Sequence, residues 1–361
     1  MRPVSRSVLR NRNFAIYLAG SVFSTNGVWI QRLTLGWMAW DSTHSEFWVG
    51  AVAFLLFVPI IVLGPVFGVL ADRSDRRRAA LLTLVFVLVV TVAFTSAVAI
   101  NVTVFNISRL LGPALAGVLI SLGGVSWVFA VNALFYVPML LALGIVKVLW
   151  KPAEAPRRAV FSGLGMGIRY ALSSSEISRF LVVAAINSVF GRGLLELLPA
   201  FADGIYARGS IRLAMLTSSA GAGAIVAGVI MSRLAVSAQR VSLGGAFAVG
   251  VGCLLLALSD AFAVGLVLVA GLGLAMTTVG IASQSAIQLH VADGYRGRVM
   301  SLWGTVGFGG TALGGLALGA VSELLSLSIA SAIRGAVCVV VVGVAIVAWR
   351  KRGYSDVRDF G

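Results

Sequence analysis

Long apolar runs, separated by short segments rich in arginine, dominate the hydropathy pattern of this chain. A helix that crosses a bilayer needs about 20 predominantly apolar residues, and most of the runs reach that length. The apolar positions are continuous and do not alternate with a period of two, so the pattern predicts membrane helices and not the strands of a barrel. The predicted runs are 14–40, 47–70, 81–96, 97–122, 125–146, 180–202, 211–232, 241–259, 262–288, 299–321 and 327–348.

The composition indicates an integral membrane protein. Apolar residues make up 59% of the 361 residues and charged residues only 11%, whereas soluble domains carry about 25% charged residues. The net charge of +15 comes mainly from clusters between the runs, as the positive-inside rule describes, so we expect no nucleic-acid partner. Both termini and these clusters are therefore predicted to be cytoplasmic, and the basic start is expected to be a retained signal-anchor. The clusters lie within 2–12, 73–78, 147–179, 233–240, 296–298 and 350–358.

The most specific motif is GVLADRSDRRR, from Gly68 to Arg78. Gly68 lets helices pack closely, Asp72 can face the positive N-terminus of a neighbouring helix, and the arginines favour the anionic cytoplasmic face. The motif resembles the signature loop of the major facilitator superfamily, with Asp75 where that family has a second glycine. The resemblance implies a gate loop made of Gly68, Asp72, Arg73, Asp75, Arg76, Arg77 and Arg78.

Three further stretches resemble the bacterial efflux-permease branch of that superfamily, which includes enterobactin exporters and transmembrane secretion effectors. NGVWIQRLTLGW (26–37) resembles its first span, NISRLLGPALAG (106–117) its fifth, and HVADGYRGRVMSLWG (290–304) the loop before its eleventh, with Asp293, Arg296 and Arg298 as loop residues. The resemblance implies an all-α membrane protein with two helical bundles around a central cavity. It also implies a monomer in the bacterial plasma membrane that exports a small molecule, such as a drug or siderophore, in exchange for protons and without a cofactor.

A weak internal repeat suggests that the first half is short. GVLADR from Gly68 has a counterpart, GVIMSR, from Gly228, and GPALAG from Gly112 returns as GTALGG from Gly310. The first pair of landmarks is 44 residues apart and the second 82, a difference of 38 residues, or about one span with its loop. Family comparison places the gap between the third and fifth spans, so the fourth span and its loop are expected to be missing.

The charge pattern leads to the same expectation. The basic segments 71–80 and 147–179 should lie on one side of the membrane, which requires an even number of crossings between them. The intervening 81–146 holds three runs, and the parity is restored if 81–96, at 16 residues, does not cross. We therefore predict about 11 membrane helices, five before the linker and six after it, of which 81–96 is too short to cross. They are arranged as an N-terminal bundle (1–146), a cytoplasmic linker (147–179) with a short helix over 159–172, and a C-terminal six-helix bundle (180–361).

Charged residues inside the spans are the candidates for chemistry, because an ionisable group at membrane depth is costly and usually functional. Glu196 is the one acidic residue clearly within a span, and it is the proton-coupling candidate. Arg192 precedes it by four residues, so a static Glu196–Arg192 pair on one helix face is the structural alternative. Arg32 and Arg109 are expected to face the cavity, to bind an anionic group or pair with Glu196, whereas Arg334 is expected to snorkel to the outer interface.

Polar and aromatic residues complete the predicted cavity: Trp29, Asn26, Gln31, Asn106 and Gln284, with each amide also explicable as an interhelical hydrogen bond. Trp40 is expected at the membrane interface and His290 as a packing residue. Cys253 and Cys338 lie inside apolar runs, and no metal site or nucleotide-binding loop is apparent. The function predicted is proton-driven export of a small molecule by alternating access, and the chain is not expected to be an enzyme. The alternative is a non-transporting membrane remnant or a regulatory or binding protein that has lost one span.

Overall fold

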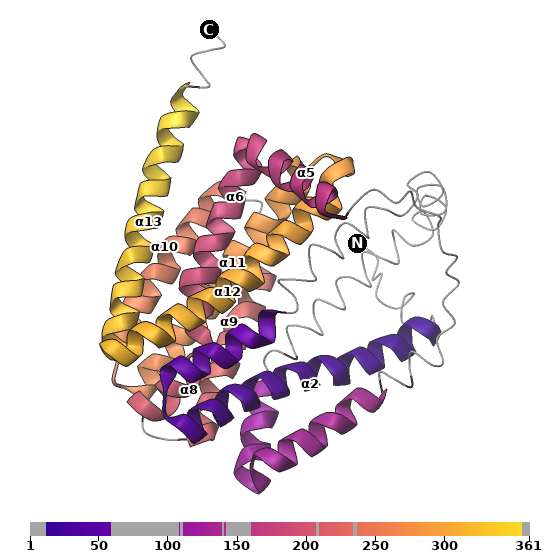
Figure 1. Ribbon diagram of the computed structural model, residues 1–361, viewed down its shortest axis with the longest axis vertical. Coiled ribbons are helices and arrows are strands. Elements are labelled where there is room, and N and C mark those ends of the chain that lie inside the picture. The colour runs from indigo at the N-terminus through magenta and orange to yellow at the C-terminus, as the bar shows by residue number, and fades with distance from the viewer. Residues whose placement is uncertain are drawn as a thin grey trace.

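The protein is helical throughout the part that its computed structural model describes, residues 12–58, 108, 111–138, 141, 160–206, 209–233 and 237–355 (Figure 1). The first predicted run is found as α2, Arg12–Thr43, and the second begins as a shorter apolar helix, Glu46–Val58. Among the described residues, seven segments have the length and the apolar composition to cross a membrane, although the first of them turns back near Gly124, as described below: Leu111–Pro138, Ser175–Ile205, Gly209–Arg233, Ala238–Ala257, Phe262–His290, Arg296–Leu324 and Leu327–Trp349.

The six runs predicted after residue 180 are all present as helices. The first is built from α6 (Ser175–Ile186), η1 (Asn187–Arg192), α7 (Gly193–Leu195), α8 (Leu198–Ala200) and η2 (Phe201–Ile205). The others are α9 (Gly209–Arg233), α10 (Ala238–Ala257), α11 (Phe262–His290), α12 (Arg296–Leu324) and α13 (Leu327–Ser355). Consecutive helices run in opposite directions, so α6, α10 and α12 begin at one end of the bundle. We name that end, where Ser175 and His290 lie, the linker end, and the opposite end the distal end.

Small residues set the close packing of this bundle. A side chain on Gly223 of α9 would overlap the carbonyl of Ala270 on α11, and one on Gly273 of α11 would overlap Ala220. Because lipid supplies no hydrophobic drive between membrane helices, such close backbone approach is what allows dispersion to hold them together. Figure 1 shows α10 and α13 side by side, and Gly335 of α13 lies against the backbone of Leu254 in the same way.

The first pass of this half is irregular at its centre. Residues 187–192 and 201–205 form π-helical turns, and Glu196 and Leu197 lie in a turn between them. Pro199, at the start of α8, has no N–H to continue the hydrogen-bond ladder. This pass is therefore the least regular of the described helices of the bundle. Wide π-turns inside longer helices are rare and occur often at functional sites.

The segment Leu111–Pro138 turns back on itself near Gly124. Gly112 lies against Trp29 of α2, and Asn132 lies against Gly27, two positions away in α2. In a straight helix the 20 residues between 112 and 132 would span about 30 Å, so both contacts require a reversal. Gly124 supplies it, with a φ of 71° that glycine tolerates and other residues rarely adopt. The turn falls at the boundary predicted between the runs 97–122 and 125–146.

The linker helix packs on the second half. The helix predicted over 159–172 is α5, Val160–Ser173, and it is followed directly by α6. Tyr170 of α5 stacks on Tyr295 of η3 (Asp293–Tyr295) with ring centroids 4.2 Å apart, and its hydroxyl accepts a hydrogen bond from the Ala292 N–H at 3.1 Å. Arg298 lies against Gly167. The linker helix is thus part of the linker end of the second bundle.

Several predictions fall outside the described residues. The gate loop Gly68–Arg78 and the polar residues Asn106 and Arg109 are among them. So are the run 81–96 and the predicted loss of a fourth span, which remain predictions.

Candidate transport site

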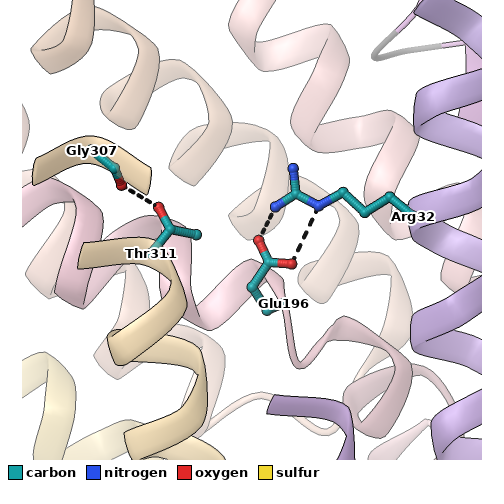
Figure 2. A network of polar contacts seen from close by, with 4 residues as sticks. All are labelled: Arg32, Glu196, Gly307 and Thr311. Atoms are coloured by element: carbon teal, nitrogen blue, oxygen red, sulfur yellow. Dashed lines mark hydrogen bonds and ion pairs between the residues drawn. The ribbon is translucent and has the colours of Figure 1, made fainter. Parts of the chain in front are cut away.

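An ion pair joins the two halves of the chain at mid-span. The guanidinium of Arg32, on α2, donates from Nη2 to Oε1 of Glu196 and from Nε to Oε2, the latter at 3.3 Å (Figure 2). The Glu196 side chain is 8% exposed and the Arg32 side chain 29%. A two-point contact of this kind fixes the relative orientation of both groups. The pair therefore connects the first pass of each half directly.

The irregular geometry of the α6–η2 pass aims Glu196 at α2. Glu196 follows α7 and lies in a turn closed by the Leu197 N–H, which donates to the Leu194 carbonyl at 3.0 Å. On its other side Glu196 packs against Gly315 of α12, where an added Cβ would be 3.3 Å from the glutamate Cβ. The turn and the glycine together leave room for a carboxylate between the halves.

Aromatic rings surround the arginine of the pair. Its guanidinium lies 5.3 Å from the ring centroid of Trp29 and 4.8 Å from that of Phe57, within the range of cation–π attraction. The ring of Phe57 in turn packs against that of Phe308 of α12, with the ring centroids 5.7 Å apart. Figure 2 shows Thr311, on the same helix, whose hydroxyl donates to its own backbone at Gly307 (2.8 Å). The arginine of the pair is thus flanked by the rings of Trp29 and Phe57.

Arg192 does not form the pair that its spacing predicted. It ends a π-helical turn, whose i to i+5 bonding breaks the regular relation between positions four apart. Arg192 interacts electrostatically with both Arg32 and Glu196, but it donates no hydrogen bond to any described residue. Two arginines, Arg32 and Arg192, are therefore within electrostatic range of the Glu196 carboxylate.

Arg334 corrects a second prediction, because it does not snorkel. Its side chain is buried at 8% exposure, and it donates from Nε to the Phe190 carbonyl at 2.8 Å and from Nη1 to the Gly314 carbonyl at 2.7 Å. The Phe190 carbonyl belongs to the π-turn, and Gly314 has no side chain to block the approach. Arg334 therefore ties α13 to α12 and to the irregular pass. In the sequence, the adjacent glycines Gly314 and Gly315 of α12 are the signal that could have indicated this close approach.

The predicted amides on α2 make interhelical hydrogen bonds. Asn26 donates from Nδ2 to Ser108 Oγ at 2.8 Å, and Gln31 Oε1 accepts from the Tyr136 hydroxyl at 3.1 Å. Gln284 is partly exposed on α11. Of the second-half loop, Asp293 lies in η3 and Arg296 and Arg298 begin α12, all at the linker end. The structure thus brings Trp29, Arg32 and Glu196 together, with Arg192 in electrostatic range.

The described contacts between the halves beyond the ion pair are concentrated toward the distal end. Trp40 of α2 is buried and donates from Nε1 to Asp203 Oδ2 at 3.1 Å, so it is not the interfacial anchor predicted. Ser45 donates to Glu323. Gly50 lies against the backbone of Gly315, where a Cβ would be 2.7 Å from the carbonyl oxygen. The distal end is therefore closed by direct backbone and polar contacts.

The described residues offer no metal centre. No three His, Cys, Asp or Glu side chains gather in the described ranges, and Cys253 and Cys338 are buried and free there.

The sequence belongs to a known family. A profile described as transmembrane secretion effector matches residues 4–96 and 92–357, nearly the whole chain. The chain is a member of the transmembrane secretion effector family. This family is the one that the motifs of the sequence predicted.

Curated relatives of this family member are more distant. The staphyloferrin A transporter of Staphylococcus aureus is 22% identical over 256 residues, covering 58% of this chain and 64% of that transporter. The enterobactin exporter EntS of Escherichia coli is 24% identical over 254 residues, covering 69% of this chain and 59% of the exporter. The chain therefore matches less than two thirds of the length of either relative.

Solved structures show the fold. A POT family transporter in complex with a thioalcohol-conjugated peptide superposes with a TM-score of 0.67 at 12% identity, over 94% of this chain and 96% of that one. A bacterial homologue of the iron transporter ferroportin, in an inward-facing state, superposes with a TM-score of 0.59 at 15% identity, over 94% of this chain and 98% of that one. The predicted major facilitator fold is thereby confirmed, while the total of about 11 spans stays a prediction.

Proposed function

We propose that this transporter exports a small molecule across the bacterial plasma membrane in exchange for protons, by alternating access. The observation that carries the proposal is the Arg32–Glu196 pair, which joins the halves at mid-span. In transporters built from repeated halves, the substrate and the coupling ion bind near the membrane midplane, between the repeats. The relatives named as a staphyloferrin A transporter and an enterobactin exporter support a small-molecule substrate.

The pair has the properties of a latch that a proton can open. Removing one charge from a buried ion pair leaves the other uncompensated, which costs about 3–5 kcal/mol. A proton on Glu196 does this reversibly and frees Arg32 to move. In the proposed cycle the linker end faces the cytoplasm and the distal end the exterior, and opening the latch lets the halves rock between inward-open and outward-open states.

Antiport requires that the proton and the substrate use the site in turn. A substrate group that donates a hydrogen bond to ionised Glu196 meets this requirement. Protonation turns one carboxylate oxygen into a hydroxyl donor, which reduces the capacity of the carboxyl to accept that hydrogen bond. Arg192, which donates to no described residue, is placed to receive an acidic or carbonyl oxygen of the same molecule. We therefore propose a substrate that carries a donor beside an acceptor oxygen, flanked by the rings of Trp29 and Phe57.

Replacing Glu196 by glutamine should abolish proton coupling. The amide keeps the shape but cannot titrate, so proton-driven transport should fall to the uncoupled leak while binding becomes independent of pH. The measurement is ΔpH-driven movement of enterobactin or staphyloferrin A by purified protein in liposomes, with internal pH followed by a trapped dye. Asp260→Asn, an exposed carboxylate in the loop between α10 and α11, is the matched control. Wild-type coupling in Glu196→Gln would contradict the assignment.

A non-transporting remnant is the second candidate, and one observation favours it. The family profile matches in two pieces that meet at residues 92–96, close to the position where the repeat predicts a missing span. The same liposomes decide between the candidates, with EntS as a positive control. If the wild-type chain is folded and monodisperse but moves neither molecule while EntS does, the remnant is favoured; proton-driven movement by the wild-type chain excludes it.

A further inference from the structure

A pocket of about 220 Å³ opens at the linker end of the second bundle, far along the helices from the ion pair. It lies where α6, α10, α11 and α13 converge, and no step of the proposed transport cycle uses it. Its lining combines cationic, polar and aromatic side chains: Glu176, Arg179, Phe180, Ser237, Gln239, His290 and Trp349, with Ala238, Ala286 and Leu289.

Arg179 is the principal charge of the pocket. Its guanidinium lies 5.8 Å from the ring centroid of Trp349, and its Nε is buried without a hydrogen-bond acceptor among the described residues. A buried donor without a partner carries a desolvation cost that an added acceptor removes. The contact with the ring holds the guanidinium beside Trp349, and both residues line the pocket.

His290 occupies the carboxylate of the pocket. Its Nδ1 is 2.7 Å from the Ala286 carbonyl oxygen, and its Nε2 is 2.7 Å from Oε2 of Glu176. The Glu176 carboxylate is therefore already engaged by the histidine, which leaves Arg179 without a carboxylate partner among the residues that line the pocket.

The start of α10 supplies further donors. Ser237 is the N-cap residue of this 20-residue helix and makes no side-chain cap hydrogen bond. The first N–H groups of a helix have no partner inside it, and together with the helix dipole they favour an anion. Ser237, Ala238 and Gln239 all line the pocket, so hydroxyl, amide and backbone donors converge on the space that Arg179 faces.

The apolar rim indicates the source of the anion. Leu289 is 83% exposed beside the pocket, and Trp349 lies at the end of an apolar span. Tryptophan at a span end is typical of the headgroup region of a bilayer, and cationic pockets between helices at this depth suit lipid phosphates. We propose that the pocket binds the phosphate of an anionic phospholipid, with Arg179 as its main contact and the exposed leucine along the acyl chains.

The test compares lipid retention between variants of the full-length protein. Wild-type protein is delipidated in detergent and re-equilibrated in detergent micelles that contain phosphatidylglycerol and phosphatidylcholine. It should retain phosphatidylglycerol selectively, as measured by mass spectrometry. Arg179→Gln should retain about tenfold less, because a charged hydrogen bond is lost, whereas Arg179→Lys, which keeps the charge, should recover most of it. Arg233→Gln, a basic residue at the linker end of α9 that does not line the pocket, is the matched control.

Each outcome decides the proposal. Equal retention by Arg179→Gln and wild type, or an equal loss in Arg233→Gln, would overturn it, and size-exclusion profiles establish that each variant is folded. A parallel arm adds inorganic phosphate to delipidated protein and follows thermal stability. Stabilisation by inorganic phosphate that depends on Arg179, without selective retention of phosphatidylglycerol, would overturn the lipid assignment and identify a soluble phosphate instead.

Discussion

Arg192 and Arg334 are both arginines at membrane depth, but their surroundings give them different parts. Arg334 donates to two backbone carbonyls and is held in place between helices. Arg192 ends the π-turn near Glu196 and donates to no described residue. Arg334 is therefore a structural tie between helices, and its third nitrogen, Nη2, is buried without an acceptor among the described residues. Arg192 makes no such backbone bond and is the arginine that we propose for the substrate.

Replacing Arg192 by glutamine should weaken substrate binding without removing its pH dependence. On the proposed mechanism the substrate binds ionised Glu196, so wild-type affinity should fall as the pH falls and protons compete for the carboxylate. Loss of Arg192 removes one charged hydrogen bond, worth about tenfold in affinity or more, while the slope against pH stays. Intrinsic tryptophan fluorescence, to which Trp29 beside the Arg32 guanidinium contributes, measures binding across pH 5–8.

The two variants separate the roles of the charges. Glu196→Gln should remove the slope, and Arg192→Gln should keep it at lower affinity. Arg233→Gln, at the linker end of α9, serves as the control for loss of an arginine. A slope that disappears in Arg192→Gln would mean that the arginine and the glutamate titrate as one unit, contrary to the proposal.

At the scale of elements, glycines decide how closely the halves approach. Helix Glu46–Val58 meets α12 where Gly50 faces Gly315, and Gly319 faces the backbone of Glu46. These contacts are backbone against backbone, so the helices have no side chains that could adjust. Closure of the distal end therefore depends on the absence of side chains at these positions.

Replacing Gly50 by valine should force the distal end open. A Cβ there would be 2.7 Å from the Gly315 carbonyl oxygen, and overpacking of this kind costs about 1–3 kcal/mol, or about fivefold to more than a hundredfold in the closed population. A short bifunctional thiol reagent should link Ser45→Cys to Glu323→Cys in the parent protein and do so much less after Gly50→Val. The native cysteines, Cys253 and Cys338, are buried and leave the background low.

The control for added volume is a glycine in open space. Gly228, on α9, has nothing within 4 Å of an added Cβ, so Gly228→Val should leave cross-linking unchanged. Equal cross-linking in Gly50→Val and the parent would show that the halves absorb the side chain without separating.

The sequence predicted the elements better than their local irregularities. Apolar runs and arginine clusters identified the six passes after the linker, the helix of the linker and the reversal at 123–124, because each depends on local hydropathy or on glycine. The π-turns around Arg192 depend on packing against α12 and α13, which no local pattern encodes. The spacing of four residues therefore suggested the Arg192 alternative, whereas the tertiary fold supplies Arg32, the other partner that the sequence offered for Glu196.

At the scale of the whole molecule, the fold followed from motifs, and the site only in part. Arg32 and Glu196 were found because a charge in an apolar run is conspicuous. The tie made by Arg334 and the bond from Trp40 to Asp203 were missed, because the acceptors are backbone or lie 163 residues away in the sequence. Arginines and tryptophans near span ends usually snorkel or anchor at the interface. In this chain Arg334 and Trp40 instead donate hydrogen bonds to acceptors on other helices.

The docking of α5 has a consequence for where the chain can be divided. Tyr170 stacks on Tyr295 and α6 follows without a gap, so α5 moves with the second half. Residues 1–157 and 158–361, produced as two polypeptides in one cell, should therefore reassemble, since the cut leaves α5 and every described contact between the halves intact. Co-purification of the tagged first fragment with the second measures this, and a cut between Ser173 and Ser175, which severs α5 from α6, should recover less. If the chain reassembles after the cut between 157 and 158 but not after the cut between Ser173 and Ser175, the linker helix α5 is the first element of the second half.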